Sequence, residues 1–409
     1  MKSVCIVVQN VYDMDARVRR KAEALASAGY SVDVLALAGP NAKKSYTLNN
    51  VHVHTLSLDK KRGSLARYIY EYAAFFIWTF FRLLRLTRQR RYAVIDVNTL
   101  PDFLILAAAP GRWLGAKLVL DMHEITPEFY MSKYGVSADS RLIRLLKYLE
   151  KISFNFADHV ITITEPIQEL LISRGLGPAK AIVVMNSADE THFSSSKPSS
   201  TADGTSDGFR MIYHGTLTRL YGLDIAIEAF HLAHKQMPGA ELWILGSGTE
   251  KEALEELARR LGLDSKVKLV GQVPSSEISS WLQRADAGVL PIRRDMFLDF
   301  AFPNKLPEFI IMERPVLMSR LKTIRHYFSE EALSYFEPQN SADLARQMVN
   351  LYRNPGLRTQ LAARAKQEYI PLRWEVMRQR YLKLIEDLAG STCPMTQRSC
   401  ATEMTAAER

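Results

Sequence analysis

The stretch VCIVVQNVYDMDARVRRKAEALASAGYSVDVLAL, residues 4–37, decides the fold class of this chain. It opens on a continuous apolar run rich in β-branched residues, passes through a polar loop into a helical segment, and ends on a second apolar run. Continuous apolar runs are typical of strands that are buried on both faces of a parallel sheet. The order strand, helix, strand therefore predicts a doubly wound α/β domain.

The same alternation continues along the chain and restarts after one break. The runs YAVIDVN, KLVLDM, HVITIT and AIVVMN follow first. Residues 194–208, SSSKPSSTADGTSDG, then have the composition of a flexible linker. After it come FRMIYHG, AELWILG, VKLVG and AGVLPI, again separated by helical sequence. We predict an N-terminal Rossmann-like domain 1–195, a Ser-rich linker 196–208, a second Rossmann-like domain 209–372, a C-terminal helix 373–390 that crosses back to the N-terminal domain, and a disordered tail 391–409.

Length and cysteine usage agree with a two-domain cytosolic protein. A chain of 409 residues exceeds what one core usually holds. The three cysteines, Cys5, Cys393 and Cys400, form neither a disulfide framework nor a metal-ligand spacing, which favours a reducing cytosol. The chain starts directly on an apolar strand, so we expect no signal peptide. No run reaches the roughly 20 apolar residues of a membrane-spanning helix.

The net charge of +9 narrows the possible partners. Such a charge suits a nucleic acid, an anionic membrane surface or a phosphorylated substrate. The basic residues are not interleaved with a stacking platform and no recognition motif occurs, so we expect no nucleic acid.

One segment, RYIYEYAAFFIWTFFRLLRLTRQRRY at 67–92, is aromatic in its first half and basic in its second. As a helix it could pack on the sheet and carry a basic cap. It could instead lie on the surface and enter the headgroup layer of an anionic membrane. Both interpretations are open from the residues alone.

The stretch FPNKLPEFIIMERPV, residues 302–316, places a carboxylate inside an apolar helix. Asn304 is expected to cap this helix and Pro307 to fall in its first turn. Glu308 could simply complement the helix dipole. It could also accept hydrogen bonds from a ribose diol, with Lys305 meeting a diphosphate, because ligands of open α/β sheets bind beyond the carboxyl ends of strands.

Three more loops follow strands in the second half and should lie on the same rim. The first holds Gly215 and Gly222 with Arg219 between them, where glycine lets the backbone approach a ligand and arginine can clamp phosphate. The others are LGSG at 245–248 and VPSSEI at 273–278. None is a dinucleotide-binding fingerprint.

In the first half, LVLDMHEITPEFY at 118–130 ends a buried strand on Asp121, His123 and Glu124. Three polar groups at a strand end favour a site over a core. The absence of a second nearby histidine argues against a metal centre. The first loop offers further polar groups that could contact a ligand, namely Asn10, Asp13, Asp15 and Arg17.

These stretches, taken together, resemble glycosyltransferase family four over about residues 1–390. The resemblance is carried by DARVRRKAEALASAGYSVDVL, DMHEITPEFY, VVMNSADETHF, YHGTL with YGLDIAIEA, LGSG, GQVPSSEISSWLQRADAGVLP and FPNKLPEFIIMERPV, in the family's order. It implies the GT-B fold, which is α/β with two Rossmann-like doubly wound domains facing a cleft. It also implies retaining transfer of a hexosyl group from a UDP-sugar or GDP-sugar to a saccharide acceptor, which we expect to be lipid-linked, in cell-envelope or exopolysaccharide biosynthesis.

Site residues are carried over where they match. Glu308 matches the second glutamate of the family's E-x7-E motif, which holds the donor ribose. His123 matches a histidine near the donor phosphate and sugar, and Gly215 matches the donor-loop glycine. Phe300 stands where the motif has its first glutamate, with Asp299 adjacent as a substitute. Thr216 and Tyr221 stand where the family has its diphosphate-binding arginine and lysine, and we expect Arg219 and Lys305 to replace them.

The resulting expectation covers three groups of residues. They are catalytic His123, Glu124 and Asp121; donor-binding Gly215, Thr216, Arg219, Gly246, Val273, Asp299, Phe302, Asn304, Lys305, Leu306 and Glu308; and acceptor-binding Asn10, Asp15 and Arg17. No metal or other cofactor is expected, because the second half holds no Asp-x-Asp and an Arg/Lys clamp can replace a cation. The expected location is the cytoplasm, with peripheral association at the inner face of the cell membrane. Two alternatives remain, a catalytically degenerate donor-binding partner subunit, suggested by Phe300, and a GT-B nucleotide-sugar epimerase or hydrolase.

Overall fold

The computed structural model describes residues 2–39, 43–58, 65–188, 190, 193 and 208–390. The chain divides into two compact units. Unit 1 contains residues up to Pro127, Val136–Val184 and the residues from Arg378 onward, and unit 2 contains Glu128–Gly135 and Met185–Met377.

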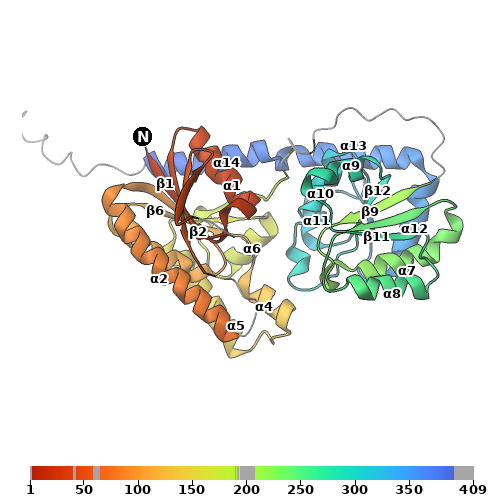
Figure 1. The fold of residues 1–409 in the computed structure, drawn as a ribbon, viewed down its shortest axis with the longest axis horizontal. Helices are drawn as coiled ribbons and strands as arrows, with labels where there is room; N and C mark the ends of the chain where they lie inside the picture. The colour runs from red at the N-terminus through yellow and green to blue at the C-terminus, as the bar shows by residue number, and fades with distance from the viewer. Residues whose placement is uncertain are drawn as a thin grey trace, which may run out of the picture. The chain divides into compact units, whose positions relative to one another are not determined.

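Unit 1 is built on an eight-stranded sheet in the order β3-β4-β2-β1-β5-β6-β7-β8 (Figure 1). The strands are β1 Ser3–Val11, β2 Ser31–Leu37, β3 Ser45–Leu48, β4 Val51–Leu56, β5 Tyr92–Asn98, β6 Lys117–Met122, β7 His159–Thr162 and β8 Ala181–Val183. All pairings are parallel except that of β3 with β4. The central strands are buried along most of their length, as their continuous apolar sequence predicts.

The helices of unit 1 are α1 Ala16–Ser27, α2 Leu65–Gln89, α3 Ala109–Trp113, α5 Arg141–Phe156, α6 Glu165–Ser173 and the greater part of α14 Trp374–Gly390. The helix α4 Thr126–Tyr134 starts in unit 1 and continues in unit 2. The long α2 packs on α3 and on a 3-10 segment, Asp102–Ala108. No helix in the described ranges is both long enough and apolar enough to cross a membrane.

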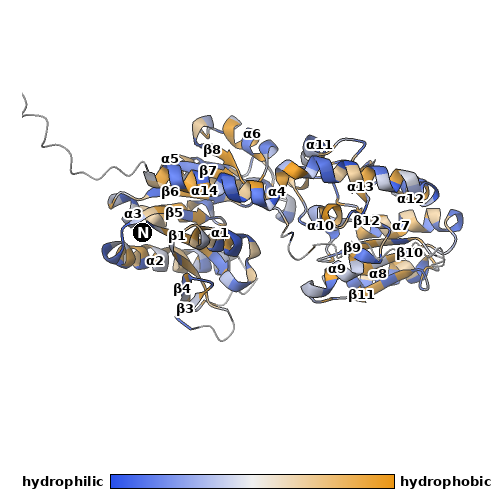
Figure 2. Ribbon diagram, turned by 90° about the horizontal axis from the view of Figure 1, so that it is seen from above, coloured by the Kyte–Doolittle hydropathy of each residue, from blue (hydrophilic) through white to orange (hydrophobic). Residues whose placement is uncertain are grey.

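Unit 2 is a six-stranded, fully parallel sheet in the order β11-β10-β9-β12-β13-β14. Its strands are β9 Arg210–His214, β10 Glu241–Leu245, β11 Val267–Gly271, β12 Ala287–Leu290, β13 Val316–Ser319 and β14 Ser334–Phe336. Its helices are α7 Leu223–Ala233, α8 Lys251–Arg260, α9 Ile278–Gln283, α10 Lys305–Ile311, α11 Lys322–Tyr327, α12 Ser341–Arg353 and α13 Pro355–Tyr369. Figure 2 shows hydrophobic colouring along the strands and mixed colouring on the helices, as expected for amphipathic helices around a buried sheet.

The predicted fold class, two doubly wound α/β domains, is confirmed. The predicted tail 391–409 and nearly all of the predicted linker 196–208 lie outside the described residues. Residues 67–89 of the segment 67–92 belong to α2, whose two faces differ, and Tyr92 is the first residue of β5. Phe75 is fully buried, whereas Phe81 is 62% exposed, so the core interpretation describes one face and the surface interpretation the other.

Candidate active site

Two glycine loops at the carboxyl edge of the unit 2 sheet are fastened together by their backbones. The N–H of Gly215 donates to Leu245 O at 2.9 Å, and the N–H of Leu217 donates to Ser247 O at 2.9 Å. Gly246 has φ +139°, and a Cβ on it would lie 1.8 Å from Gly215 O. Only glycine fits there, so the glycines predicted as a donor loop are required by the close approach of these two loops.

Lys305 and Glu308, both from the short helix α10, lie beside this loop. The Lys305 side chain crosses Gly215, since a Cβ on that glycine would meet Lys305 Cε at 2.1 Å. Lys305 Nζ lies 4.4 Å from the ring centre of Tyr221. The Glu308 side chain is 20% exposed, and its Oε2 lies 3.2 Å from His214 Nε2. That contact lacks hydrogen-bond geometry, which leaves His214 Nε2 without a partner among the described residues.

The electrostatics of these three groups follow from burial. Burial raises the pKa of Glu308 to about 7, although the positive charge of Lys305 opposes the shift. Burial, together with the positive charge of Lys305, lowers the pKa of His214 to about 3, so the imidazole is neutral at neutral pH. Burial also lowers the pKa of Lys305. The site therefore offers one carboxyl group that changes charge near neutrality, beside an ammonium group.

The exposed residues of the predicted donor set are Thr216, Arg219 and Asn304, with Val273 partly exposed. The guanidinium of Arg219 makes no ion pair with any residue that the structure describes, while its carbonyl accepts from Arg293 at 3.0 Å. It is therefore available to an anionic ligand.

Several predicted donor residues make contacts within the protein. The side chain of Leu306 is fully buried, so this residue can offer only its backbone to a ligand. The ring of Phe302 packs on Tyr327 and Phe328. Asn304 precedes α10 but makes no side-chain cap, because its backbone is already helical and its Oδ1 accepts from Asn186 instead.

The predicted substitution of Asp299 for the missing glutamate is not supported by its contacts. Asp299 Oδ1 accepts from the N–H of Lys322 at 2.8 Å, at the start of α11, and lies 3.7 Å from Arg294. Phe300 packs against the Lys322 ammonium at 5.0 Å. Both residues therefore hold the 3-10 turn Leu298–Phe300 and α11 together.

In unit 1, Asp121 lies in a buried network of charges. It is fully buried and accepts from Arg17 and Lys21, each at 2.5 Å. Lys21 also lies 2.7 Å from Asp96, itself fully buried. These cations hold the pKa of Asp121 far below its usual value against the opposing effect of burial. Asp121 therefore has no surface that a ligand could contact, contrary to its predicted catalytic role, while Arg17, predicted to bind an acceptor, is paired with Asp121 and keeps 9% of its side chain exposed.

His123 lies above this network and keeps 20% of its side chain exposed. Its Nε2 is 3.0 Å from Asn98 Oδ1, which also accepts from Lys21 at 3.0 Å. Because that oxygen accepts, Nε2 carries the proton, and Nδ1 is left as an acceptor. Burial lowers the pKa of His123, and the charge of Arg17 adds to the shift. The neutral imidazole can therefore orient or accept a hydroxyl proton of a substrate.

Glu124 is partly exposed beside this histidine. Its charge contributes to a raised pKa at Asp102, which burial brings to about 7 although Thr126 donates to it at 2.9 Å. Glu124 thus remains a candidate for contact with a ligand.

The polar groups of the first loop bind one another. Asp15 caps α1 by accepting from the N–H of Val18 at 3.1 Å, and Asn10 donates to its other oxygen at 3.0 Å. Asp13 accepts from the Tyr46 hydroxyl at 2.9 Å. These contacts give the loop's polar groups partners within the protein, and because both side chains are partly exposed, acceptor binding by Asn10 and Asp15 stays a prediction.

Sequence reasoning missed Lys21, Asp96, Asn98, His214 and Tyr381. Asp96 and Asn98 end a buried strand in the same way as Asp121, and His214 directly precedes Gly215, so a signal existed for these three. Tyr381 carries no signal, because its partner Asp96, which accepts from its hydroxyl at 2.7 Å, is 285 residues away in the chain.

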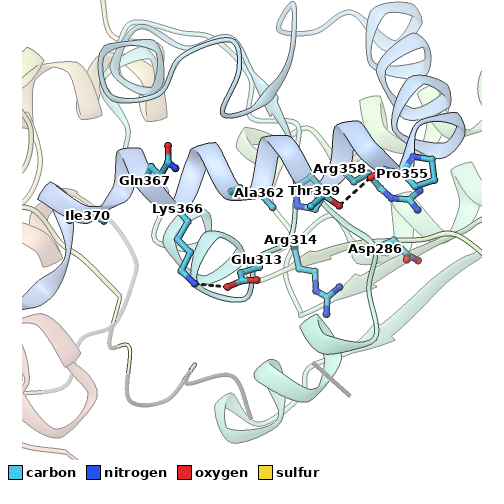
Figure 3. A pocket seen from close by; sticks show the side chains of 12 residues that line it. Asp286, Glu313, Arg314, Pro355, Arg358, Thr359, Ala362, Lys366, Gln367 and Ile370 are labelled. Atoms are coloured by element: carbon cyan, nitrogen blue, oxygen red, sulfur yellow. Dashed lines mark hydrogen bonds and ion pairs between the residues drawn. The ribbon is translucent and has the colours of Figure 1, made fainter. Parts of the chain in front are cut away.

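Unit 2 also contains a cavity of about 630 Å³ whose lining includes neither Lys305 nor Glu308 (Figure 3). It is lined by Asp286 and Pro315, which precede β12 and β13, and by α13. Its Lys366 pairs with its Glu313. A cavity at the amino ends of the strands is on the wrong edge for a ligand of a doubly wound sheet. Within the described residues no cluster of three or more His, Cys, Asp or Glu side chains could hold a metal ion.

Both halves of the chain are similar to glycosyltransferases. Residues 14–187 match the family model "Glycosyl transferase 4-like domain", and residues 208–354 match "Glycosyl transferases group 1". The chain is 24% identical over 266 residues to the probable glycosyltransferase WbjE of Pseudomonas aeruginosa, and the match spans 62% of this chain and 64% of that relative.

Solved structures share the fold. Sucrose-phosphate synthase of Thermosynechococcus elongatus superposes with a TM-score of 0.74 at 19% identity, over 95% of this chain and all of that one. Anabaena HepE in complex with UDP-glucose superposes with a TM-score of 0.68 at 16% identity, with the same coverage.

Proposed function

We propose that this chain, which two glycosyltransferase family models match over residues 14–187 and 208–354, transfers a hexosyl group from a nucleoside diphosphate sugar to a saccharide acceptor, with retention of configuration. The observation that carries the donor assignment is the Glu308 carboxyl group, partly exposed beside Lys305 at the carboxyl edge of the unit 2 sheet. A carboxylate there can accept from both hydroxyls of a ribose.

The cations of the same edge suit the leaving group. Cleavage of the sugar–phosphate bond leaves negative charge on the diphosphate, which fixed positive groups stabilise. Lys305 lies over the donor loop, and Arg219 is exposed in the next turn. With these two cations we propose that no divalent metal is required. Sugar transfer that disappears with a chelator and returns with Mg²⁺ would overturn the proposal that no divalent metal is required.

The donor is proposed to be a UDP-sugar or a GDP-sugar. The HepE structure was solved with UDP-glucose, which supports a uridine donor in this fold. In unit 1 we assign His123 and Glu124 to contact with substrate, because both keep exposed surface. Asp121 and Asn98 then position His123.

A binding panel tests the donor site. UDP, GDP and ADP are titrated against the wild type and Glu308→Ala while thermal unfolding is followed. A nucleotide at about 100 Kd should stabilise the fold by about 2.7 kcal/mol, and the variant should lose that gain. If no nucleotide stabilises the wild type, the donor assignment is wrong.

A second function, a donor-binding subunit without turnover, is favoured by one observation. Phe300 and Asp299 are engaged with α11, so nothing at this turn replaces the missing glutamate. The two functions differ in a direct assay, because the subunit would bind nucleotide but release none from the sugar nucleotide in the presence of saccharide acceptors.

We further propose that the acceptor is lipid-linked, in cell-envelope or exopolysaccharide assembly, and that the protein acts peripherally at the cytoplasmic face of the membrane. Support comes from the exposed face of α2 and its neighbour α3, where Ile77, Phe81 and Trp113 are 55%, 62% and 68% exposed. Arg85, Arg88 and Arg112 border this apolar surface and are also exposed. Aromatic and basic groups side by side suit the headgroup layer of an anionic membrane.

Flotation with lipid vesicles tests the proposed membrane association separately from the donor site. The wild type should float with vesicles that contain phosphatidylglycerol and should not float with phosphatidylcholine alone. The double variant Ile77→Glu, Phe81→Glu should stay unbound on both. Wild type that ignores both vesicles would remove the membrane proposal and leave the donor site untouched.

A further inference from the structure

A second feature of α2 lies beside its exposed apolar face. A cavity of about 420 Å³ opens between the C-terminal half of α2 and the strands β3, β4 and β2, which are the last three strands at one side of the sheet. Its polar lining includes Arg82, Arg85 and Arg90 from one side and Thr47, His52 and His54 from the other. We call it the arginine cavity. Its volume lies in the range of about 300–1,000 Å³ that is common for ligand sites.

Asp33 is the one carboxylate among the described lining residues, and it is already hydrogen-bonded within the protein. Asp33 is buried and accepts from His54 Nε2 at 2.9 Å, from the Tyr92 hydroxyl at 2.9 Å and from Arg90 at 3.3 Å. Its negative charge is thus matched by Arg90. Burial alone would raise the pKa of Asp33. The hydrogen bonds from His54 and Tyr92 outweigh that effect, so the pKa is lowered and the carboxylate stays ionised.

Among the residues that the structure describes, the other two arginines have no carboxylate partner. Arg82 donates to His54 Nδ1 at 2.8 Å, so Nδ1 accepts and the proton of this imidazole is on Nε2, facing Asp33. The Nε of Arg82 is buried and unpaired. Arg85 forms no hydrogen bond or ion pair with any residue in the described ranges. Arg82, which is partly buried, and the exposed Arg85 therefore face one cavity without a carboxylate partner among the described residues, so an anion bound there would gain two guanidinium partners.

We propose that the arginine cavity binds the phosphate group of an anionic lipid. Guanidinium groups bind phosphate oxygens in bidentate geometry, and the neighbouring hydroxyl and imidazole groups of the lining can add single hydrogen bonds. A lipid is favoured over a soluble phosphate because of the position on α2. Arg85 follows Phe81 by one helical turn, so the mouth of the cavity lies next to the apolar surface proposed to enter the membrane. The proposal rests on the membrane association proposed above and is independent of the donor site.

The cavity of unit 2 provides a contrast. There Lys366 is paired with Glu313, and Arg358 donates to Leu351 O and lies over the ring of Phe209. The third cation of that lining, Arg314, donates to Gln283 O at 2.9 Å and has an Nε without a partner among the described residues, as Arg82 has. The lining also holds two carboxylates, Asp286 and Glu313, so its cations are better matched by negative charge than those of the arginine cavity.

Arg85→Gln tests the proposal, with Arg88→Gln as its matched control. Both arginines are exposed on α2, neither is paired with a described residue, and each substitution removes one charge. Only Arg85 lines the cavity. Binding is measured by flotation with vesicles of phosphatidylcholine plus phosphatidylglycerol, at several lipid concentrations. Thermal unfolding with glycerol 3-phosphate, a soluble probe, is followed in parallel.

Loss of one arginine near an anionic surface should weaken binding about fivefold through general attraction. We expect this modest loss for Arg88→Gln and a loss of about fiftyfold or more for Arg85→Gln. Equal losses for the two variants would overturn the proposal and leave only general attraction. If glycerol 3-phosphate stabilises the wild type but not Arg85→Gln while the vesicle losses are equal, the cavity takes a soluble phosphate and the lipid assignment is wrong. Wild type that binds no vesicle also overturns it, while nucleotide binding at Glu308 would still stand.

Discussion

The carboxyl group of Glu308 makes donor binding sensitive to pH in a predictable direction. Because burial raises its pKa to about 7, a growing fraction is protonated as the pH falls below neutrality. A protonated carboxyl group can accept fewer hydrogen bonds from a ribose. We expect the Kd of the nucleotide selected in the binding panel to rise by up to about tenfold per pH unit below the pKa. Calorimetric titration between about pH 5 and pH 8 measures it.

The control for this prediction is Glu308→Gln. The terminal phosphate of a nucleotide titrates near pH 6, so its own contribution must be separated. The glutamine variant retains that contribution and loses the titration of the carboxyl group. Parallel pH profiles for the two proteins would show that Glu308 does not bind the nucleotide as an ionised group.

A second residue, Lys21, holds unit 1 together from inside. It is 1% exposed and lies within 2.7 Å of two buried carboxylates, Asp96 and Asp121. Lys21→Met would leave those carboxylates with too little positive charge, at a cost of about 3–5 kcal/mol in the free energy of unfolding. Urea denaturation measures the loss. Arg19→Ala, on the same helix, removes a partly exposed ion pair, in which Arg19 Nε lies 3.6 Å from Glu23, and should cost less than about 1 kcal/mol. Similar losses for both would contradict the prediction.

These residues show where sequence reasoning stops. Glu308 could be found because a carboxylate in an apolar helix is unusual, and His123 because it follows a buried strand. Asp121 looked equally functional, but it is paired with two cations of α1, Arg17 and Lys21. No local sequence pattern indicates which polar group at a strand end is paired in this way. Burial and pairing depend on contacts across the sheet, which single-sequence patterns do not carry.

At the scale of elements, the contact between the loops after β9 and β10 depends on glycine. Gly246→Ala would put a Cβ 1.8 Å from Gly215 O at a backbone angle that other residues rarely adopt. We expect a loss of about 3 kcal/mol or more in stability and weaker nucleotide binding. Gly262→Ala is the control, because its φ is also positive at +69° but no atom lies within 4 Å of the added Cβ. It should cost only about 1–2 kcal/mol. Equal costs in chemical denaturation would show that the loops can separate.

Sequence patterns predicted the strands and glycine loops well because each is local. The helix α2 shows the limit of that approach. Its aromatic residues occur on all sides, so periodicity alone could not separate the buried Phe75 from the exposed Phe81. The distinction needed the position of α3 and of the 3-10 segment on which α2 packs.

At the scale of the whole molecule, the chain returns at its end to the unit in which it began. Residues of α14 from Arg378 onward belong to unit 1, and the Tyr381 hydroxyl donates to Asp96 there at 2.7 Å. Tyr381→Phe would leave Asp96 with one donor fewer in a buried site. We expect unit 1 to lose about 1–3 kcal/mol. Hydrogen exchange should then speed up in β1, β5 and β6 and stay unchanged in the strands of unit 2.

The matched substitution in the other unit is Tyr335→Phe. Its hydroxyl is also buried and donates to Phe328 O at 2.8 Å, so the same chemical group is removed from a similar environment. This variant should speed up exchange in β13 and β14 and leave β1, β5 and β6 unaffected. The pair thereby tests whether the two units are separate cooperative bodies and whether the C-terminal helix is part of the first. Faster exchange in unit 2 after Tyr381→Phe, or in both units after either substitution, would mean that α14 stabilises the molecule as one body.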